Sequence, residues 1–130
     1  MIYVDTSVAL AQLLAEDQRP PAWLWGETLV ASRLLEYELW ARLNARKLAK
    51  SHAEAAHGFV GRLAILELSP AVLTRALEPF PKPVRTLDAL HLASLDYLRR
   101  SGQPIDLASY DRRMRTAAEA MGIRTVDLDQ

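Results

Sequence analysis

Acidic side chains in this sequence recur at one kind of position, the junction between a strand-like apolar run and the helix expected after it. Asp5 directly follows the run Ile2-Tyr3-Val4, which is rich in residues that favour strands. Ligands of open parallel sheets bind outside the carboxyl ends of the strands, where such junctions lie side by side. We therefore expect one acidic site at that edge, made by Asp5, Glu36, Asp88 and Asp111.

A group of four carboxylates is suited to binding a divalent cation. Mg²⁺ and Mn²⁺ prefer oxygen ligands, and Mg²⁺ keeps several of its water molecules. Converging carboxylates cannot all remain ionised unless cations lie between them. Metal ions held in this way can activate a water and stabilise the leaving oxygen when a phosphodiester is cleaved. The acidic residues therefore predict metal-dependent hydrolysis.

A simpler explanation applies to each of the later acids taken alone. Carboxylates in the first turn of a helix interact favourably with the helix dipole, and Glu36, Asp88 and Asp111 are all expected near such a turn. Arginines close in sequence are available to them as surface partners, namely Arg33, Arg85 and Arg112. Asp5 is harder to explain in this way, because it follows a buried strand in an apolar opening segment.

The order of the expected elements favours a mainly parallel sheet, because strands and helices alternate as they do where helical crossovers cover both faces of a sheet. The expected strands are 2–4, 28–31, 64–68, 105–108 and 123–126. The expected helices are 8–14, 21–26, 34–49, one that opens on a capping box at 51–54 and ends near 63, 70–77, 87–100 and 111–121. This pattern predicts a single domain over residues 1–130, folded as a three-layer α/β/α sandwich.

Helix ends carry capping signals. Thr6, Ser7 and Thr86 are the expected N-caps of their helices, because a side-chain hydroxyl can accept a hydrogen bond from the first free backbone N–H groups. Gly102 and Gly122 are expected to end the last two helices, since glycine adopts the left-handed conformation common after a helix.

Composition narrows the classes of function. The chain has 16 basic and 16 acidic side chains, so its net charge of zero excludes binding to nucleic acid by overall charge. Local basic patches are candidates for such contacts, namely Arg42, Arg46, Lys47 and Lys50, then Lys82 and Arg85, and finally Arg112, Arg113 and Arg115. The sequence has no cysteine, no apolar run near the ~20 residues that a membrane span needs, and no visible secretion signal. We expect a cytoplasmic protein with no membrane partner.

Segments of the chain resemble the PIN domain, and more closely the VapC-type toxins of bacterial VapBC toxin–antitoxin pairs. They are Tyr3-Val4-Asp5-Thr6-Ser7, Leu35-Glu36-Tyr37-Glu38-Leu39, Arg85-Thr86-Leu87-Asp88-Ala89-Leu90-His91-Leu92-Ala93 and Ala108-Ser109-Tyr110-Asp111-Arg112-Arg113. They occur in the family's order, and the match covers essentially the whole chain. The resemblance implies a PIN-like α/β/α sandwich and a metal-dependent endoribonuclease that uses Mg²⁺ or Mn²⁺.

The resemblance also implies metal ligands. Asp5 and Asp88 are expected to be the strongest ligands, and Asp111 is expected to complete the site directly or through water. Glu36 is the expected acid of its segment because the family motif aligns there. Glu38 lies two residues further along the helix and is expected to face away, by a rotation of roughly 200°.

Other residues near the expected ligands take supporting roles. Thr6 and Ser109 match polar positions beside the acids and are expected to orient ligands or water. His91 is expected to pack or to support the ligands and not to bind metal. Some relatives carry a further acid after the last aspartate, where this chain has Met114 and Arg115.

Membership of this family implies partners as well: a small VapB-type antitoxin, an RNA substrate, and a second copy of the chain in a homodimer. The helices around Trp23, Trp25, Leu39 and Trp40 are candidates for those contacts, with ordinary core packing as the alternative. Two other functions stay open. One is a PIN nuclease of RNA processing that is not a toxin, and the other is a catalytically silent binding domain of the same fold.

Overall fold

A single parallel sheet forms the centre of the protein, which we describe from a computed structural model for residues 1–14 and 17–129. Its strands are β1 (Ile2–Val4), β2 (Leu29–Ser32), β3 (Ala64–Leu66) and β4 (Asp106–Ala108), in the spatial order β3-β2-β1-β4. Tyr3 pairs with Val30 on one side and with Leu107 on the other, so β1 is an inner strand. Whatever follows β1 therefore lies at the middle of the sheet edge.

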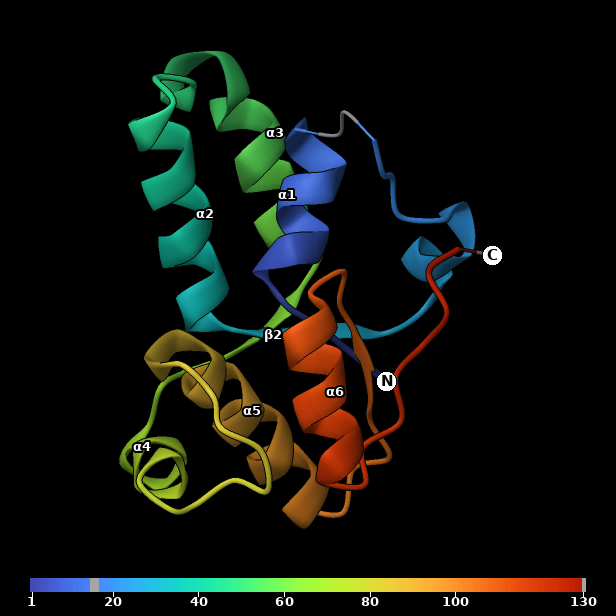
Figure 1. The fold of residues 1–130 in the computed structure, drawn as a ribbon. Helices are drawn as coiled ribbons and strands as arrows, with labels where there is room; N and C mark the ends of the chain where they lie inside the picture. The colour runs from blue at the N-terminus through green and yellow to red at the C-terminus, as the bar shows by residue number, and fades with distance from the viewer. Residues whose placement is uncertain (15–16, 130) are drawn as a thin grey trace.

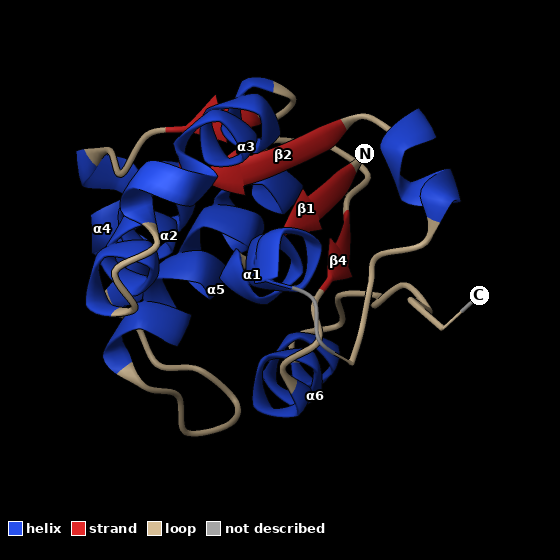
Figure 2. Ribbon diagram, turned by 90° about the horizontal axis from the view of Figure 1, so that it is seen from above, coloured by secondary structure: helices blue, strands red, loops and turns tan. Residues whose placement is uncertain are grey.

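Helices cover both faces of the sheet, which confirms the predicted three-layer architecture (Figures 1 and 2). The helices α1 (Thr6–Leu14), α2 (Arg33–Ala45) and α3 (Ala49–Gly61) lie together on one side. On the other side are α4 (Pro70–Ala76), α5 (Thr86–Arg100) and α6 (Arg112–Ala120). A short 3₁₀ helix, η1 (Ala22–Gly26), lies in the connection between α1 and β2. Within the described residues, no helix is both long and apolar enough to cross a membrane.

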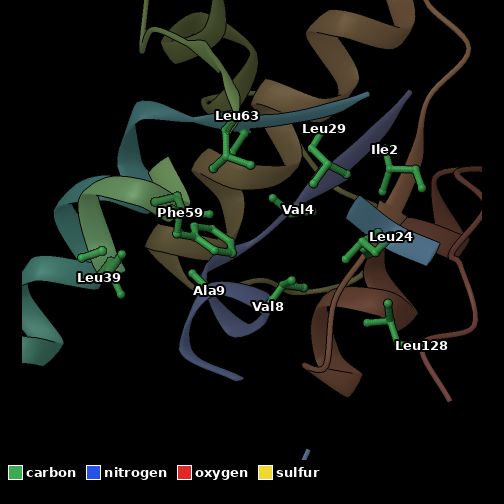
Figure 3. Packing of buried hydrophobic residues seen from close by; sticks show 14 of the residues in the cluster. Ile2, Val4, Val8, Ala9, Leu24, Leu29, Leu39, Phe59, Leu63 and Leu128 are labelled. Atoms are coloured by element: carbon green, nitrogen blue, oxygen red, sulfur yellow. The ribbon is translucent and has the colours of Figure 1, made fainter. Parts of the chain in front are cut away.

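The side chains of β1 alternate between two apolar clusters, as a strand buried on both faces requires. Ile2 and Val4 contribute to the cluster under α1, α2 and α3, where Val8 and Phe59 are also buried (Figure 3). Tyr3 points to the opposite cluster, which is formed mainly by residues of α5, α6 and β4. Because both faces of β1 are packed, the position of Asp5 at its end is fixed by the core.

A buried ion-pair cluster fixes α5 against its neighbours. The Asp96 carboxylate accepts a hydrogen bond of 2.6 Å from Arg75 of α4 and one of 2.7 Å from Arg99. Arg100 lies 3.1 Å from the same carboxylate, and Arg99 also donates to the backbone oxygen of Met121 after α6. Only 1% of the Asp96 side chain is exposed, so its buried charge depends on these arginines for compensation.

Two helix predictions are wrong around the connection from α2 to α3. The helix expected over 34–49 ends at Ala45, and Lys47 adopts a left-handed conformation with φ of 58°. The capping box expected at Ser51 does not form, because α3 has already begun at Ala49 and the Ser51 hydroxyl donates to the backbone oxygen of Leu48. The turn has neither glycine nor proline to mark it, which is why the pattern predicted one longer helix.

Helix starts differ by a residue or two from the predictions. The first helix begins at Thr6, so Thr6 and Ser7 are its first residues, while Asp5 accepts from the Ser7 backbone N–H at 3.1 Å. Thr86 is likewise the first residue of α5 and not its cap. Gly102 and Gly122 do follow their helices with φ of 89° and 81°, as predicted.

The last predicted strand is reduced to a single bridge. Leu107 of β4 pairs with Thr125, and Leu107 exchanges backbone hydrogen bonds of 2.9 Å with Arg124 and Val126. The segment 123–126 therefore lies beside β4 in parallel, but it forms no regular strand.

Candidate active site

Asp5 is the most deeply buried acid at the carboxyl edge of the sheet, with 3% of its surface exposed. Its backbone N–H donates to Ala108 at the end of β4, which ties the ends of β1 and β4 together. The two carboxylate oxygens accept hydrogen bonds of 2.5 Å from Ser7 and from Ser109. The side chain is therefore held in one orientation by two hydroxyls that come from opposite ends of the chain.

Burial dominates the electrostatics of Asp5 and raises its pKa, because the ionised carboxylate loses its water. The hydrogen bonds from Ser109 and Ser7 and the nearby His91 act in the opposite direction, and the charge of Asp111 raises the pKa further. The net shift of the Asp5 pKa is upward, so the charged form of Asp5 is destabilised in the metal-free protein. A bound cation would relieve that strain.

Ser109 links Asp5 to Asp111. Its hydroxyl donates to Asp5 and accepts the backbone N–H of Asp111 at 3.0 Å. Asp111 in turn caps α6, because its side chain accepts from the backbone N–H groups of Arg113 and Met114. The predicted supporting role of Ser109 as an orienting group agrees with this geometry, and the cap accounts for part of why Asp111 is placed here.

Glu36 and Glu38 have different surroundings on α2. The Glu36 carboxylate lies 3.2 Å from Arg33 on the exposed side of α2, as the simpler explanation from surface pairing predicts. Glu38 accepts a hydrogen bond of 2.7 Å from Thr6, the residue that follows Asp5. The expectation that Glu38 faces away is therefore wrong, because α2 packs with the face that carries Glu38 turned to the start of α1.

His91 connects Glu38 to the sheet. Its Nε2 lies 2.6 Å from Glu38 Oε1, and its Nδ1 lies 2.8 Å from the Tyr3 hydroxyl. Burial raises the pKa of Glu38, but the hydrogen bond and charge of His91, with help from Thr6 and Arg42, outweigh it and leave that pKa lowered. Glu38 thus remains ionised while Asp5 is pushed toward its neutral form. His91 is buried and supports Glu38, in line with the predicted packing role.

Asp88 lies at the start of α5 beside Arg85. The Arg85 guanidinium is 3.4 Å from the Asp88 carboxylate and 3.9 Å from that of Asp111. Asp88 and Asp111 therefore border one space, which an arginine of the chain bridges. About 18% of the Asp88 side chain and 32% of the Asp111 side chain are exposed, so both are open to solvent on this edge.

The donor set fits a hard divalent cation in its chemistry, since the polar groups that meet here are carboxylates and hydroxyls. The buried and destabilised charge of Asp5 is the observation that favours a cation. Within residues 1–14 and 17–129, no three acidic, histidine or cysteine side chains are grouped closely enough to hold one ion as they stand. Arg85 lies between two of the acids, so side chains must move to admit a metal.

Replacing Asp5 by asparagine should stabilise the metal-free protein at neutral pH. The raised pKa means that the folded chain holds the Asp5 proton to higher pH than the unfolded chain does. Stability is therefore lost as pH rises from the unfolded pKa through the folded one, and Asp5→Asn removes that loss. We expect a higher urea midpoint for Asp5→Asn at pH 7 in EDTA.

Asp127→Asn is the matched control, because Asp127 is exposed and asparagine can still accept the Asp129 backbone N–H, so the midpoint should stay nearly unchanged. A midpoint for Asp5→Asn at or below that of the parent would contradict the assignment of strain to Asp5.

Comparison with known proteins supports one family. A model of the PIN domain matches residues 2–120. Ribonuclease VapC35 of Mycobacterium tuberculosis is 31% identical over 132 aligned residues, which cover 97% of this chain and 96% of that protein. Ribonuclease VapC47 of the same organism is 30% identical and covers 96% of this chain and 95% of its own length.

Solved structures agree in fold. A crystal structure of VapC20 from Mycobacterium tuberculosis, described as a toxin that cleaves the sarcin–ricin loop, superposes with a TM-score of 0.70 at 22% identity, covering 97% of this chain and 98% of that one. The structure of PAE2754 from Pyrobaculum aerophilum superposes with a TM-score of 0.65 at 19% identity, covering 98% and 83%. Because the family match and the curated relatives both run along nearly the whole length, the chain belongs to the PIN-domain family, among its VapC-type members.

Proposed function

We propose that this protein is the toxin of a type II toxin–antitoxin pair and acts as a metal-dependent endoribonuclease. The observation that carries the proposal is the buried Asp5 carboxylate, which is oriented by two serines at the sheet edge and has further acids beside it. The names of the curated relatives, both ribonucleases of the VapC type, support the same activity. The whole chain acts as one PIN domain in this proposal.

Asp5, Asp88, Asp111 and Glu38 are the residues that we propose to hold Mg²⁺ or Mn²⁺. A bound ion of this kind would supply activation of a water and stabilisation of the charge that develops on the phosphate during cleavage. Ser7 and Ser109 keep the Asp5 oxygens aimed into the site. Thr6 and His91 fix the orientation of Glu38, as hydrogen bonds from a second layer do for metal ligands generally.

Arg85 has a different task in the proposed site. In the protein alone its guanidinium offsets the charges of Asp88 and Asp111. About 67% of its side chain is exposed, so it can leave the acids when a cation arrives. Once displaced, the arginine stays near the edge of the site and can pair with an RNA phosphate.

Asp5→Asn should lower RNA cleavage by roughly 10³-fold, because the ligand that lies deepest in the site loses its charge. Asp106→Asn is the control, since Asp106 is at the opposite end of β4 and pairs with Arg124 at 2.6 Å. Cleavage of a mixed RNA pool is followed by sequencing the new ends, with and without EDTA. Equal cleavage by Asp5→Asn and the parent in Mn²⁺ would overturn the proposed activity.

Glu38→Gln and Glu36→Gln form a second matched pair on one helix. Glu38→Gln should reduce cleavage by roughly 10- to 100-fold, the range seen when groups that hold or orient a metal are changed. Glu36→Gln should stay within about twofold of the parent, because Arg33 keeps its 2.6 Å contact with Glu67. The reverse order would restore Glu36 as the acid of the site.

We also propose two protein partners in the cytoplasm: a cognate VapB-type antitoxin and a second copy of this chain in a homodimer. Exposed leucines on α4 and at the start of α5 supply an apolar surface for such a contact, with 43% of Leu73, 87% of Leu77 and 44% of Leu87 exposed. Among the earlier candidates, Leu39 is buried and Trp25 and Trp40 pack partly against the core, whereas 38% of Trp23 is exposed.

Light scattering of the purified protein tests the homodimer. We expect a mass twice that of the 14.6 kDa chain, and Leu77→Asp should shift the protein to monomers. A monomeric parent at micromolar concentration would contradict the homodimer without touching the nuclease proposal, whose site lies within one chain.

A further inference from the structure

The site has a neighbouring groove that the proposed chemistry does not use. The groove has a volume of about 330 Å³ and lies between α1 and α2, and we call it the α1–α2 groove. Its lining consists of Ser7, Leu10, Ala11, Leu14, Arg42 and Arg46, together with Asp17, Gln18 and Tyr110. We propose that this groove binds a nucleotide of the RNA strand next to the scissile phosphodiester. This inference rests on the proposed ribonuclease function.

Continuity with the acids is the first argument. Ser7 is part of the groove wall, and the same hydroxyl donates to Asp5. Tyr110 is tied to this point as well, because its backbone N–H donates to Ser7 at 2.8 Å. A strand whose phosphodiester lies over Asp5 and which continues past Ser7 and Tyr110 therefore brings its next nucleotide to the mouth of the groove.

Charge is the second argument. Arg42 and Arg46 are one helical turn apart on α2, and both are exposed. Arg42 is four residues after Glu38 on α2, and Arg46 follows at the end of that helix, so the two arginines continue from Glu38 along one helix face. The chain has no net charge, so local cations of this kind have to supply the attraction for phosphates.

The shape and lining of the groove favour a nucleotide over a bare anion. Leu10, Ala11 and Leu14 are partly exposed along α1, and Tyr110, which packs partly against the core, borders the same space. Single-stranded RNA is bound by pairing phosphates with cations and by packing bases on aromatic and apolar surfaces. Asp17 is the single acid among the described lining residues, which fits a site for a polyanion.

Binding of RNA to a cleavage-deficient chain tests the inference directly. The probe is a fluorescein-labelled single-stranded RNA of mixed sequence, titrated by anisotropy into the Asp5→Asn protein at several salt concentrations. Adding Arg42→Gln and Arg46→Gln should weaken binding about tenfold or more. It should also reduce the slope of log K against log salt by about 1.4, because each phosphate contact to a single strand contributes about 0.7.

The control removes two positive charges elsewhere. Arg62 and Arg124 are exposed and outside both the groove lining and the candidate basic patches, so Arg62→Gln with Arg124→Gln should change affinity less than twofold. Tyr110→Leu should also weaken binding, whereas Tyr110→Phe should restore it, since phenylalanine keeps the stacking ring. Thermal unfolding of each variant checks that the fold is intact.

Kinetics of the parent background separate this inference from the proposed function. With Asp5 present, Arg46→Gln, which changes the arginine further along the chain from Glu38, should raise KM while kcat stays near that of the parent, because the groove binds and does not react. If the parent cleaves RNA and these variants bind RNA as the control does, the groove assignment fails and the nuclease stands. If the variants instead keep their affinity for RNA and lose only binding to the co-expressed antitoxin, the groove is a binding site for the antitoxin and the inference is overturned.

Discussion

The buried carboxylate of Asp5 is the constraint on which the rest of the structure depends. It stands at the end of an inner strand that is packed on both faces, so it cannot move without the core. Its oxygens are held by Ser7 and Ser109, and its charge is costly in the protein alone. In the proposed metal site, the buried charge of Asp5 favours binding of a cation, and it lowers the folding stability of the metal-free protein.

A second layer of polar contacts orients the site from the other face of the sheet. Tyr3 points away from the apolar cluster that holds Ile2 and Val4, and its hydroxyl meets His91 on α5. The other ring nitrogen of His91 forms a hydrogen bond with Glu38 of α2. One buried histidine therefore sets the relative position of a strand and two helices, and Glu38 is ionised as a result of that contact.

Sequence patterns predicted the sheet and the positions of Asp5, Asp88 and Asp111 because these depend on strand ends and helix starts, which are local features. The choice between Glu36 and Glu38 depends on how α2 is rotated against the sheet. A signal was nonetheless present: Glu38 lies four residues after Leu34 and three after Leu35, both buried, so it shares their face. A polar residue within an apolar stripe deserved preference over an acid that has an arginine three residues before it.

Other features had no local signal. The partners of His91 lie 53 and 88 residues away in sequence, and only tertiary packing brings them together. The break between α2 and α3 falls at Lys47, where a left-handed backbone occurs without glycine. The segment 123–126 has a strand-like composition and does lie beside β4, but it pairs with β4 through one bridge only. Its composition predicted its place beside the sheet and did not predict how little of it would pair.

The hydrogen bond between Ser109 and Asp5 joins residues 104 positions apart, and so it links folding to completion of the chain. A ribosome that has made β1, α1 and α2 has made Asp5 and Glu38, but not the strand that supplies Ser109 and Asp111. Pairings of such long range form late, since loop closure must come first. A nascent chain that has not reached β4 therefore lacks both the serine that orients Asp5 and the acid beside it, so the group around Asp5 assembles only after the start of α6 has been made.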